Sequence, residues 1–265
     1  MASFELPPRS NSLMVSQTSD TYQFRHEDER QRAVSSMSGY VKNKPEQVKF
    51  FESLMRPQVM DRKGLKVLDA CCGIGDLTYF LNLMNPDATY VGVDRAGFLV
   101  KEAQQNFAGT SNVSFIEWDV NNLSSRFAEN TFDLTVCKQT LSWLPDYKPT
   151  VSELIKVTGE SIFVSSLFYD GRIDFETRVR EYETDAGKSD FNAYYNVYSF
   201  PVFREFCLSQ GAKEVSGFDF NIEIDLPKPD DANRMGTYTL KLESGERLQI
   251  SGALLMPWKI VKIDL

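Results

Sequence analysis

Two aspartates in the first half of the chain end short apolar runs, and a stretch of mostly small residues follows the first of them. Asp69 ends the first run, Asp94 ends the second, and the stretch from Ala70 to Gly75 follows Asp69 directly. A carboxylate at the tip of a strand can accept hydrogen bonds from ribose hydroxyls. A small-residue turn lets backbone N–H groups at a helix start approach a ligand. The spacing therefore favours a ligand that contains a nucleoside.

The elements that must position these residues are a strand, a tight turn, a helix and a second strand. The short apolar run Val67-Leu68, which ends at Asp69, predicts the first strand, and the run from Asp76 to Met84 predicts the helix. A break at Asn85-Pro86 ends the helix, and residues 90–93 predict the second strand. This order places the turn against the helix N-terminus, where the helix dipole favours negative charge.

Two cofactors use such a unit. A dinucleotide site favours G-x-G-x-x-G, whose third glycine allows close packing of helix and strand. Here Thr78 takes the third position, and Asp76 would lie beside the pyrophosphate. S-adenosylmethionine (SAM) carries no phosphate and needs an acid for its ribose diol. We therefore favour SAM as the cofactor. The alternative is that this stretch is a glycine turn of some other α/β protein.

The stretch Asp69-Ala70-Cys71-Cys72-Gly73-Ile74-Gly75 resembles motif I of class I SAM-dependent methyltransferases, D-x-G-x-G-x-G, with Cys71 in place of the first glycine. Asp94 resembles the acidic residue that follows the second strand in this family. The resemblance implies that the cofactor is SAM, with S-adenosylhomocysteine as its product. It also implies a set of cofactor-binding residues, namely Asp69, Cys71, Gly73, Gly75, Asp94 and Arg95.

Two further positions fit the family's cofactor site. Residues 112–119 predict a strand that ends at Asp119, where the family has an acid for the adenine amino group and a backbone N–H, here that of Val120, for a ring nitrogen. A simple turn at the strand end is the alternative, because Asp and Asn are common in turns. Lys138 is expected at the carboxyl end of the next strand, where it would contact cofactor, substrate or solvent.

The segment around Lys138 also bears on the substrate. Enzymes of this class that methylate amino groups of bases carry Asn or Asp, Pro, Pro and an aromatic residue here, whereas this chain has Lys138-Gln139-Thr140-Leu141. That difference argues against a nucleobase amine. Trp143 follows shortly afterwards and would line the substrate pocket or belong to the core.

An insertion at about 169–197 follows the fifth predicted strand and is expected to cover the methyl donor. Its tyrosines, arginines and Asn196 suggest a pocket for a polar molecule such as a sugar, amino acid or natural product. A helical insert facing solvent is the alternative, because many acidic residues accompany the arginines. We list Trp143, Tyr169, Arg172 and Tyr198 as substrate-binding candidates, and Tyr194 and Tyr195 as catalytic candidates.

The N-terminal region, residues 1–44, is expected to comprise a flexible end and a lid helix. By the family resemblance, Tyr22 and Tyr40 are candidate cofactor contacts. His26 is the only histidine of the chain, and histidine often abstracts a proton near neutral pH. His26 is therefore a candidate general base, with a surface position in a charged helix as the alternative.

Composition excludes several functions. The net charge of −8 opposes binding of a nucleic-acid backbone. No apolar run of about 18 residues predicts a membrane-spanning helix, and no signal-peptide core precedes the domain, so we expect a cytoplasmic protein without membrane insertion. The four cysteines have no zinc or disulfide spacing, and we expect no metal. A monomer or a homodimer is expected.

The predicted fold is a Rossmann-like α/β domain over residues 45–265. We expect a seven-stranded methyltransferase sheet with helices on both faces, an antiparallel C-terminal hairpin, and lid segments from the N-terminus and the insertion. The predicted activity is methyl transfer from SAM to an oxygen or nitrogen of a small polar metabolite. The alternatives are a non-catalytic SAM-fold binding protein and a methyltransferase that acts on protein or lipid.

Overall fold

A computed structural model describes residues 31, 34–35, 39–180, 192–230 and 235–265. Tyr22 and His26, the predicted cofactor contact and general base of the N-terminal region, lie outside these ranges. Within the ranges, no helix is long and apolar enough to span a lipid bilayer.

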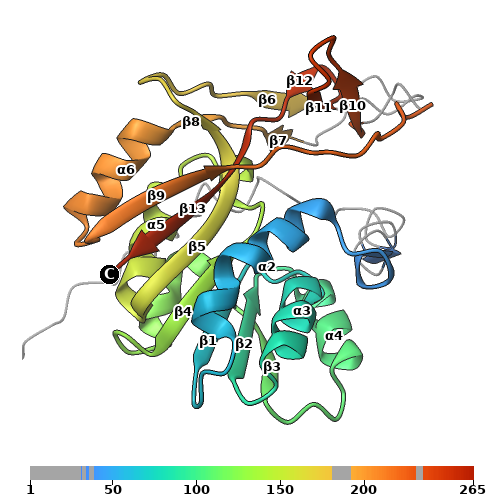
Figure 1. Ribbon diagram of the computed structural model, residues 1–265. Coiled ribbons are helices and arrows are strands. Elements are labelled where there is room, and N and C mark those ends of the chain that lie inside the picture. The colour runs from blue at the N-terminus through green and yellow to red at the C-terminus, as the bar shows by residue number, and fades with distance from the viewer. Residues whose placement is uncertain (1–30, 32–33, 36–38, 181–191, 231–234) are drawn as a thin grey trace, which may run out of the picture.

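A central sheet runs through the molecule in the strand order β3-β2-β1-β4-β5-β13-β9 (Figure 1). The first five strands are parallel, and β13 is antiparallel to both of its neighbours. These seven strands confirm the predicted methyltransferase sheet with its antiparallel C-terminal strand, and the short strand β8 Tyr198–Ser199, paired with β5, is an eighth strand of the same sheet. The bounds are β1 Lys66–Ala70, β2 Thr89–Asp94, β3 Val113–Glu117, β4 Phe132–Cys137, β5 Thr158–Tyr169, β9 Glu214–Asp219 and β13 Trp258–Asp264.

Helices cover both faces of this sheet. On one face lie α2 Glu46–Val59, α3 Asp76–Met84 and α4 Gly97–Asn106; on the other lie α5 Lys148–Val157, α6 Phe200–Ser209 and the short 3-10 helix η2 Val120–Ser125. A second 3-10 helix, η3 Leu141–Trp143, follows β4. The sequence favours helices over residues 45–55, 76–84, 96–107, 147–158 and 198–210, and the helices α2 to α6 agree with these ranges to within about four residues.

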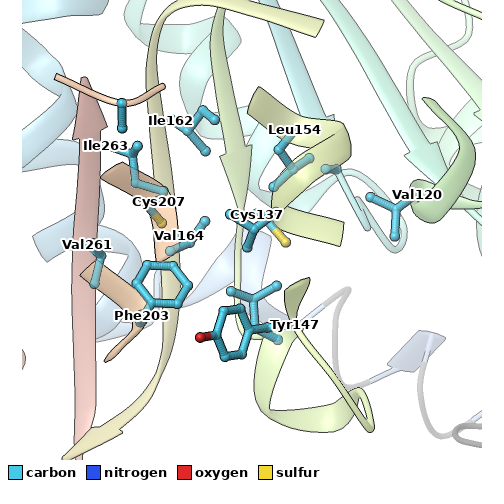
Figure 2. Close-up of a cluster of buried hydrophobic side chains, with 14 of the residues drawn as sticks. Val120, Cys137, Tyr147, Leu154, Ile162, Val164, Phe203, Cys207, Val261 and Ile263 are labelled. Atoms are coloured by element: carbon cyan, nitrogen blue, oxygen red, sulfur yellow. The ribbon is translucent and has the colours of Figure 1, made fainter. Parts of the chain in front are cut away.

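The two core layers divide the residues of each buried strand between them. In β5, Ile162 and Val164 face the α5/α6 side, whereas Phe163 faces α2 and contacts the ring of Phe51 at 6.5 Å between centroids. Alternation of side chains along a strand explains this division. Figure 2 shows the layer on the α5/α6 side, in which Tyr147, Phe203 and Cys207 pack against β5 and β13. A strand buried on both faces keeps its carboxyl end rigidly in place.

Two boundaries differ from the sequence-based expectation. Gly159 is expected from the sequence to separate a helix over 147–158 from a strand over 160–168, because glycine often ends a helix. Instead, β5 already begins at Thr158, whose hydroxyl pairs with that of Thr135 on β4.

Alternating apolar residues favour one long strand from Glu214 to Leu226, but β9 ends at Asp219. Among the described strands β9 pairs with β13, which begins at Trp258, so the pairing stops after the Phe220 N–H has donated to the Trp258 carbonyl; farther on, Leu226 bonds instead to Thr239 of β10 (Thr237–Lys241).

Small accessory sheets lie above the carboxyl ends of β5 and β9 (Figure 1). The described part of the insertion forms strands: β6 Arg178–Arg180 pairs with β7 Asn192–Tyr194. The short strand β8 Tyr198–Ser199 extends beside β5. The predicted C-terminal hairpin is present as β10 Thr237–Lys241 and β11 Arg247–Ser251, with β12 Leu254–Leu255 added.

Candidate active site

The turn after β1 is built from left-handed backbone. Cys71, Gly73 and Gly75 have φ angles of 61°, 56° and 81°, a region that favours glycine. Cys71 therefore adopts this conformation despite its side chain, which answers the question raised by the missing first glycine. A Cβ atom on Gly75 would lie 2.6 Å from Cζ of Phe115, so this position requires glycine. Gly75 also forms the N-cap of α3.

Asp94 holds this turn from the end of β2. Its Oδ2 accepts a hydrogen bond from the Gly73 N–H at 2.9 Å, and its Oδ1 accepts one from the Ala96 N–H at 2.9 Å. Burial raises the pKa of the Asp94 carboxyl, and the two backbone N–H groups counteract that shift. Each carboxylate oxygen keeps a second lone pair for a further donor. Arg95, the next residue, is exposed.

Asp69 lies beneath the turn and not at its surface. Its Oδ2 accepts a hydrogen bond from the Thr78 hydroxyl at 2.7 Å, and only 2% of the residue is exposed. Burial raises the pKa of Asp69 to about 7. Sequence reasoning treated Thr78 only as a missing glycine, yet its hydroxyl ties α3 to β1. A hydroxyl residue one turn into the helix was the signal that could have identified this contact.

Asp119 lies two residues beyond the end of β3 and caps the 3-10 helix η2. Its Oδ1 accepts a hydrogen bond from the Asn121 N–H at 2.9 Å, as expected for the turn alternative. Its Oδ2 has no partner among the residues that the structure describes. Val120 is buried in the core. The Trp118 N–H donates to the Asp94 carbonyl at 3.0 Å, which keeps Asp119 on the same edge of the sheet as Asp94.

A buried ion pair joins β4 to α3. The Lys138 ammonium binds Oδ2 of Asp76, and 13% and 6% of the two side chains are exposed. The ring of Tyr40 lies 5.6 Å from the same ammonium. The pair was not anticipated, although Asp76 was noted as an acid beside the turn. It brings Tyr40 and Lys138, both predicted cofactor contacts, together at the start of α3.

The substrate and catalytic candidates do not converge on one point. Trp143 packs against Tyr195 with 4.9 Å between ring centroids, in an apolar cluster above β5. Tyr198 is buried, and its hydroxyl contacts the backbone carbonyls of Leu141 and Leu144, which makes it a packing residue. The other candidates, Tyr169, Arg172 and Tyr194, lie farther out on the insertion.

The three outer candidates differ in their exposure and in their contacts. Tyr169 is exposed and packs its ring on Phe175 at 5.5 Å. The Arg172 guanidinium pairs with the Glu205 carboxylate at the surface. Tyr194 lies on β7 and is half-buried. Within the described ranges, no group of three or more His, Cys, Asp or Glu side chains could hold a metal ion.

Comparison with known proteins decides the family. A family model described as "Methyltransferase domain" matches residues 61–216. The chain belongs to this methyltransferase family. Its fold is that of the class I SAM-dependent methyltransferases, whose cofactor is SAM, so the resemblance seen in motif I is confirmed.

Individual relatives agree with this assignment. Residues of the chain are 30% identical over 113 positions to a demethylmenaquinone methyltransferase of Staphylococcus aureus, an alignment covering 42% of this chain and 46% of the relative. The chain thus spans about half the length of the curated relatives it matches.

Two solved structures show the shared fold. A magnesium protoporphyrin IX methyltransferase from Synechocystis PCC 6803 with bound S-adenosylhomocysteine has a TM-score of 0.51, 15% identity, and coverage of 89% of this chain and 86% of that chain. The YcgJ protein from Bacillus subtilis has a TM-score of 0.53, 15% identity, and coverage of 80% and 96%.

Proposed function

We propose that this methyltransferase transfers the methyl group of SAM to an oxygen or nitrogen of a small-molecule acceptor. The observation that carries the proposal is the Asp94 carboxylate, held at the carboxyl end of β2 by the Gly73 and Ala96 N–H groups. Ligands of parallel α/β sheets bind at this edge. The membership of the chain in the methyltransferase family supports the same reading.

The residues present fit SAM better than a dinucleotide. Asp94 offers lone pairs to the ribose hydroxyls. Asp76, buried at the first position of α3, would disfavour a pyrophosphate there. Asp119 offers one carboxylate oxygen to the adenine amino group. Cys71, Arg95, Lys138 and Tyr40 border this site, whereas Asp69 lies behind it.

The amino-acid end of SAM carries both charges, and the Lys138–Asp76 pair offers both counter-charges near the turn. When bound, SAM supplies an electrophilic methyl group on a sulfonium. The chain itself contributes alignment, which can lower the barrier by about 7–11 kcal/mol. We assign no general base. Of the candidates, His26 lies outside the described residues, Tyr195 is 9% exposed within an apolar cluster, and Tyr194 stays a prediction.

The acceptor is proposed to be a small metabolite with a polar reacting atom, in line with the sequence-based expectation of a sugar, amino acid or natural product. Trp143, which lies just beyond β4, supports an acceptor site at this edge. The pairing of Arg172 with Glu205 weakens the argument for a charged substrate. The net charge of −8 continues to oppose a nucleic acid. A cytoplasmic location and a monomeric or homodimeric state are further proposals.

Deuterium transfer tests this function directly. The full chain would be incubated with SAM that carries a deuterated methyl group and with fractionated cell extract, and the small-molecule, lipid and protein fractions would be analysed by mass spectrometry. We expect label in a small molecule, with S-adenosylhomocysteine formed in equal amount. Label in lipid or protein would contradict the small-molecule assignment. Cofactor binding with no labelled product would identify a non-catalytic binding protein.

A further inference from the structure

An apolar cluster lies over the carboxyl end of β5 and the start of β13. We call it the carboxyl-edge cluster; its principal members are Trp143, Leu167, Tyr195, Phe220, Met256 and Trp258. It draws on η3, on the insertion, and on β5 and β13. All of its described members are apolar or aromatic. A molecule bound against it must therefore present an apolar, preferably flat, surface.

Trp258 brings an unsatisfied polar atom into this cluster. Its indole Nε1 is buried and has no hydrogen-bond partner among the residues that the structure describes, and only 6% of the residue is exposed. Buried donors are nearly always satisfied. By contrast, the Trp118 Nε1–H donates to the Asn122 carbonyl at 2.9 Å. The indole N–H only donates, so the missing partner must be an acceptor such as an oxygen.

The position of Trp258 relates this donor to the cofactor site. Trp258 pairs with Leu167 and lies two residues before Ile260, so both Trp258 and Leu167 are on the sheet face that α2 covers. Trp143, another member of the cluster, lies five residues beyond Lys138 at the end of β4. The cluster is thus at the same edge of the sheet as the Lys138–Asp76 pair.

A second unsatisfied group lies on this face. Gln47, in the first turn of α2, is 6% exposed, and neither atom of its amide has a partner among the described residues. Its neighbour Phe50 contacts Phe220 of the carboxyl-edge cluster at 5.9 Å between ring centroids. Because α2 ends beside the start of β1, its first turn points toward the carboxyl edge.

Gln58 Oε1, near the end of α2, and Gln249 Oε1, on β11, are also buried without a partner among the described residues. Trp258 and Gln47 differ in lying toward the carboxyl edge on the face that α2 covers, and these two groups point to a ligand there.

From these observations we infer that the methyl acceptor binds against the carboxyl-edge cluster. The geometry points to an uncharged, ring-bearing molecule with a carbonyl or phenolic oxygen that accepts a hydrogen bond from Trp258 Nε1–H. This inference rests on the proposed methyltransferase function and narrows its acceptor. It replaces the polar pocket expected around Arg172 with an apolar one.

The test uses the indole resonances of the full chain labelled with nitrogen-15 and saturated with S-adenosylhomocysteine. The probes are 2-naphthol and 1-indanone, which carry an oxygen, and naphthalene, which does not. Phenylalanine substitution of each tryptophan assigns the three resonances. We expect the Trp258 indole proton to shift downfield, saturably, with both oxygen-bearing probes and to shift less with naphthalene. The Trp118 resonance, whose N–H is already bonded, should not move.

A variant measures the contribution of the hydrogen bond. Trp258→Phe should weaken binding of 2-naphthol about fivefold, as for the loss of one hydrogen bond, and leave binding of naphthalene and of S-adenosylhomocysteine unchanged. If the wild-type Trp258 resonance is unmoved by both oxygen-bearing probes, the inference is overturned, whether or not the variant folds. Calorimetry on the same sample separates the two claims, because absent binding of S-adenosylhomocysteine would defeat the proposed function itself.

Discussion

The turn after β1 depends on left-handed backbone at individual residues. Gly75 is the residue of this turn at which a side chain is least tolerated. Its φ angle of 81° and the close approach of Phe115 constrain it twice, by conformation and by space. Gly64 has a similar φ angle of 69° but nothing within 4 Å of the position of a Cβ atom. The two glycines thus allow the cost of a steric overlap to be separated from the cost of left-handed backbone.

Gly75→Ala should therefore be more damaging than Gly64→Ala. We expect both variants to pay about 1–2 kcal/mol for the φ angle, and Gly75→Ala to lose a further 1–3 kcal/mol, roughly, from the overlap with Phe115. The free energy of unfolding in urea checks this difference. Equal destabilisation of the two variants would contradict the packing described around Phe115.

The raised pKa of Asp69 predicts that the free energy of unfolding depends on pH. Burial raises its pKa to about 7, whereas in the unfolded chain the pKa is about 3.9. Between these values the folded state keeps a proton that the unfolded state has released, so the free energy of unfolding falls as pH rises, by up to about 1.4 kcal/mol per pH unit. Asp69→Asn removes this contribution.

Chemical unfolding of the wild type and of Asp69→Asn across this pH range gives the measurement. The difference between their stabilities should shift in favour of the variant as the pH rises from about 4 to about 7. A difference that stays constant over the range would show that the Asp69 carboxyl titrates normally in the folded protein.

At the scale of elements, the link between β4 and α3 depends on Lys138 and Asp76. Their side chains are mostly buried, so removing one partner leaves an uncompensated charge. We expect Lys138→Met and Asp76→Asn each to destabilise the fold by roughly 3 kcal/mol. The double variant should lose less than the sum, because it removes both charges. A double-mutant cycle by urea unfolding checks this, and additive losses would rule out the coupling.

The sequence predicted helices and strands well where the spacing of apolar residues and the residues that end an element indicated the same bounds. The helix from Asp76 to Met84 was predicted to the residue, because a glycine turn precedes it and Asn85-Pro86 follows it. The boundary expected at Gly159 was wrong, because a glycine can lie within a strand as well as end a helix. The alternation after Asp219 suggested a longer strand, but pairing ends where β13 begins. Local patterns do not report whether a partner strand is present.

The same limit applies to the site. Asp94 and the glycines could be predicted because their chemistry requires those residue types. The Lys138–Asp76 and Asp69–Thr78 contacts join residues 62 and 9 positions apart, and pairing at such distances follows from strand order. The burial of Tyr198 and the surface pairing of Arg172 were likewise set by packing that an isolated segment does not reveal.

At the scale of the whole molecule, the parallel sheet presents its carboxyl ends to one side, and the accessory strands lie over that side (Figure 1). The proposed cofactor residues lie around the carboxyl ends of β1, β2 and β4, whereas the carboxyl-edge cluster lies at β5 and β13. This arrangement places a proposed methyl donor and a proposed acceptor on adjacent parts of one edge. Proximity of that kind is the main contribution of the fold to methyl transfer.

The most direct test of this account is calorimetric titration of the full chain with SAM, S-adenosylhomocysteine and NAD, repeated on Asp94→Asn. The matched control is Asp133→Asn, because Asp133 accepts the Lys66 N–H at 2.7 Å, at the start of β1 and hence at the opposite edge of the sheet. We predict binding of both sulfur nucleosides and none of NAD. The affinity should fall at least about tenfold in Asp94→Asn and stay unchanged in Asp133→Asn. Folded, ligand-free protein that binds NAD, or that binds neither sulfur nucleoside, would contradict the account.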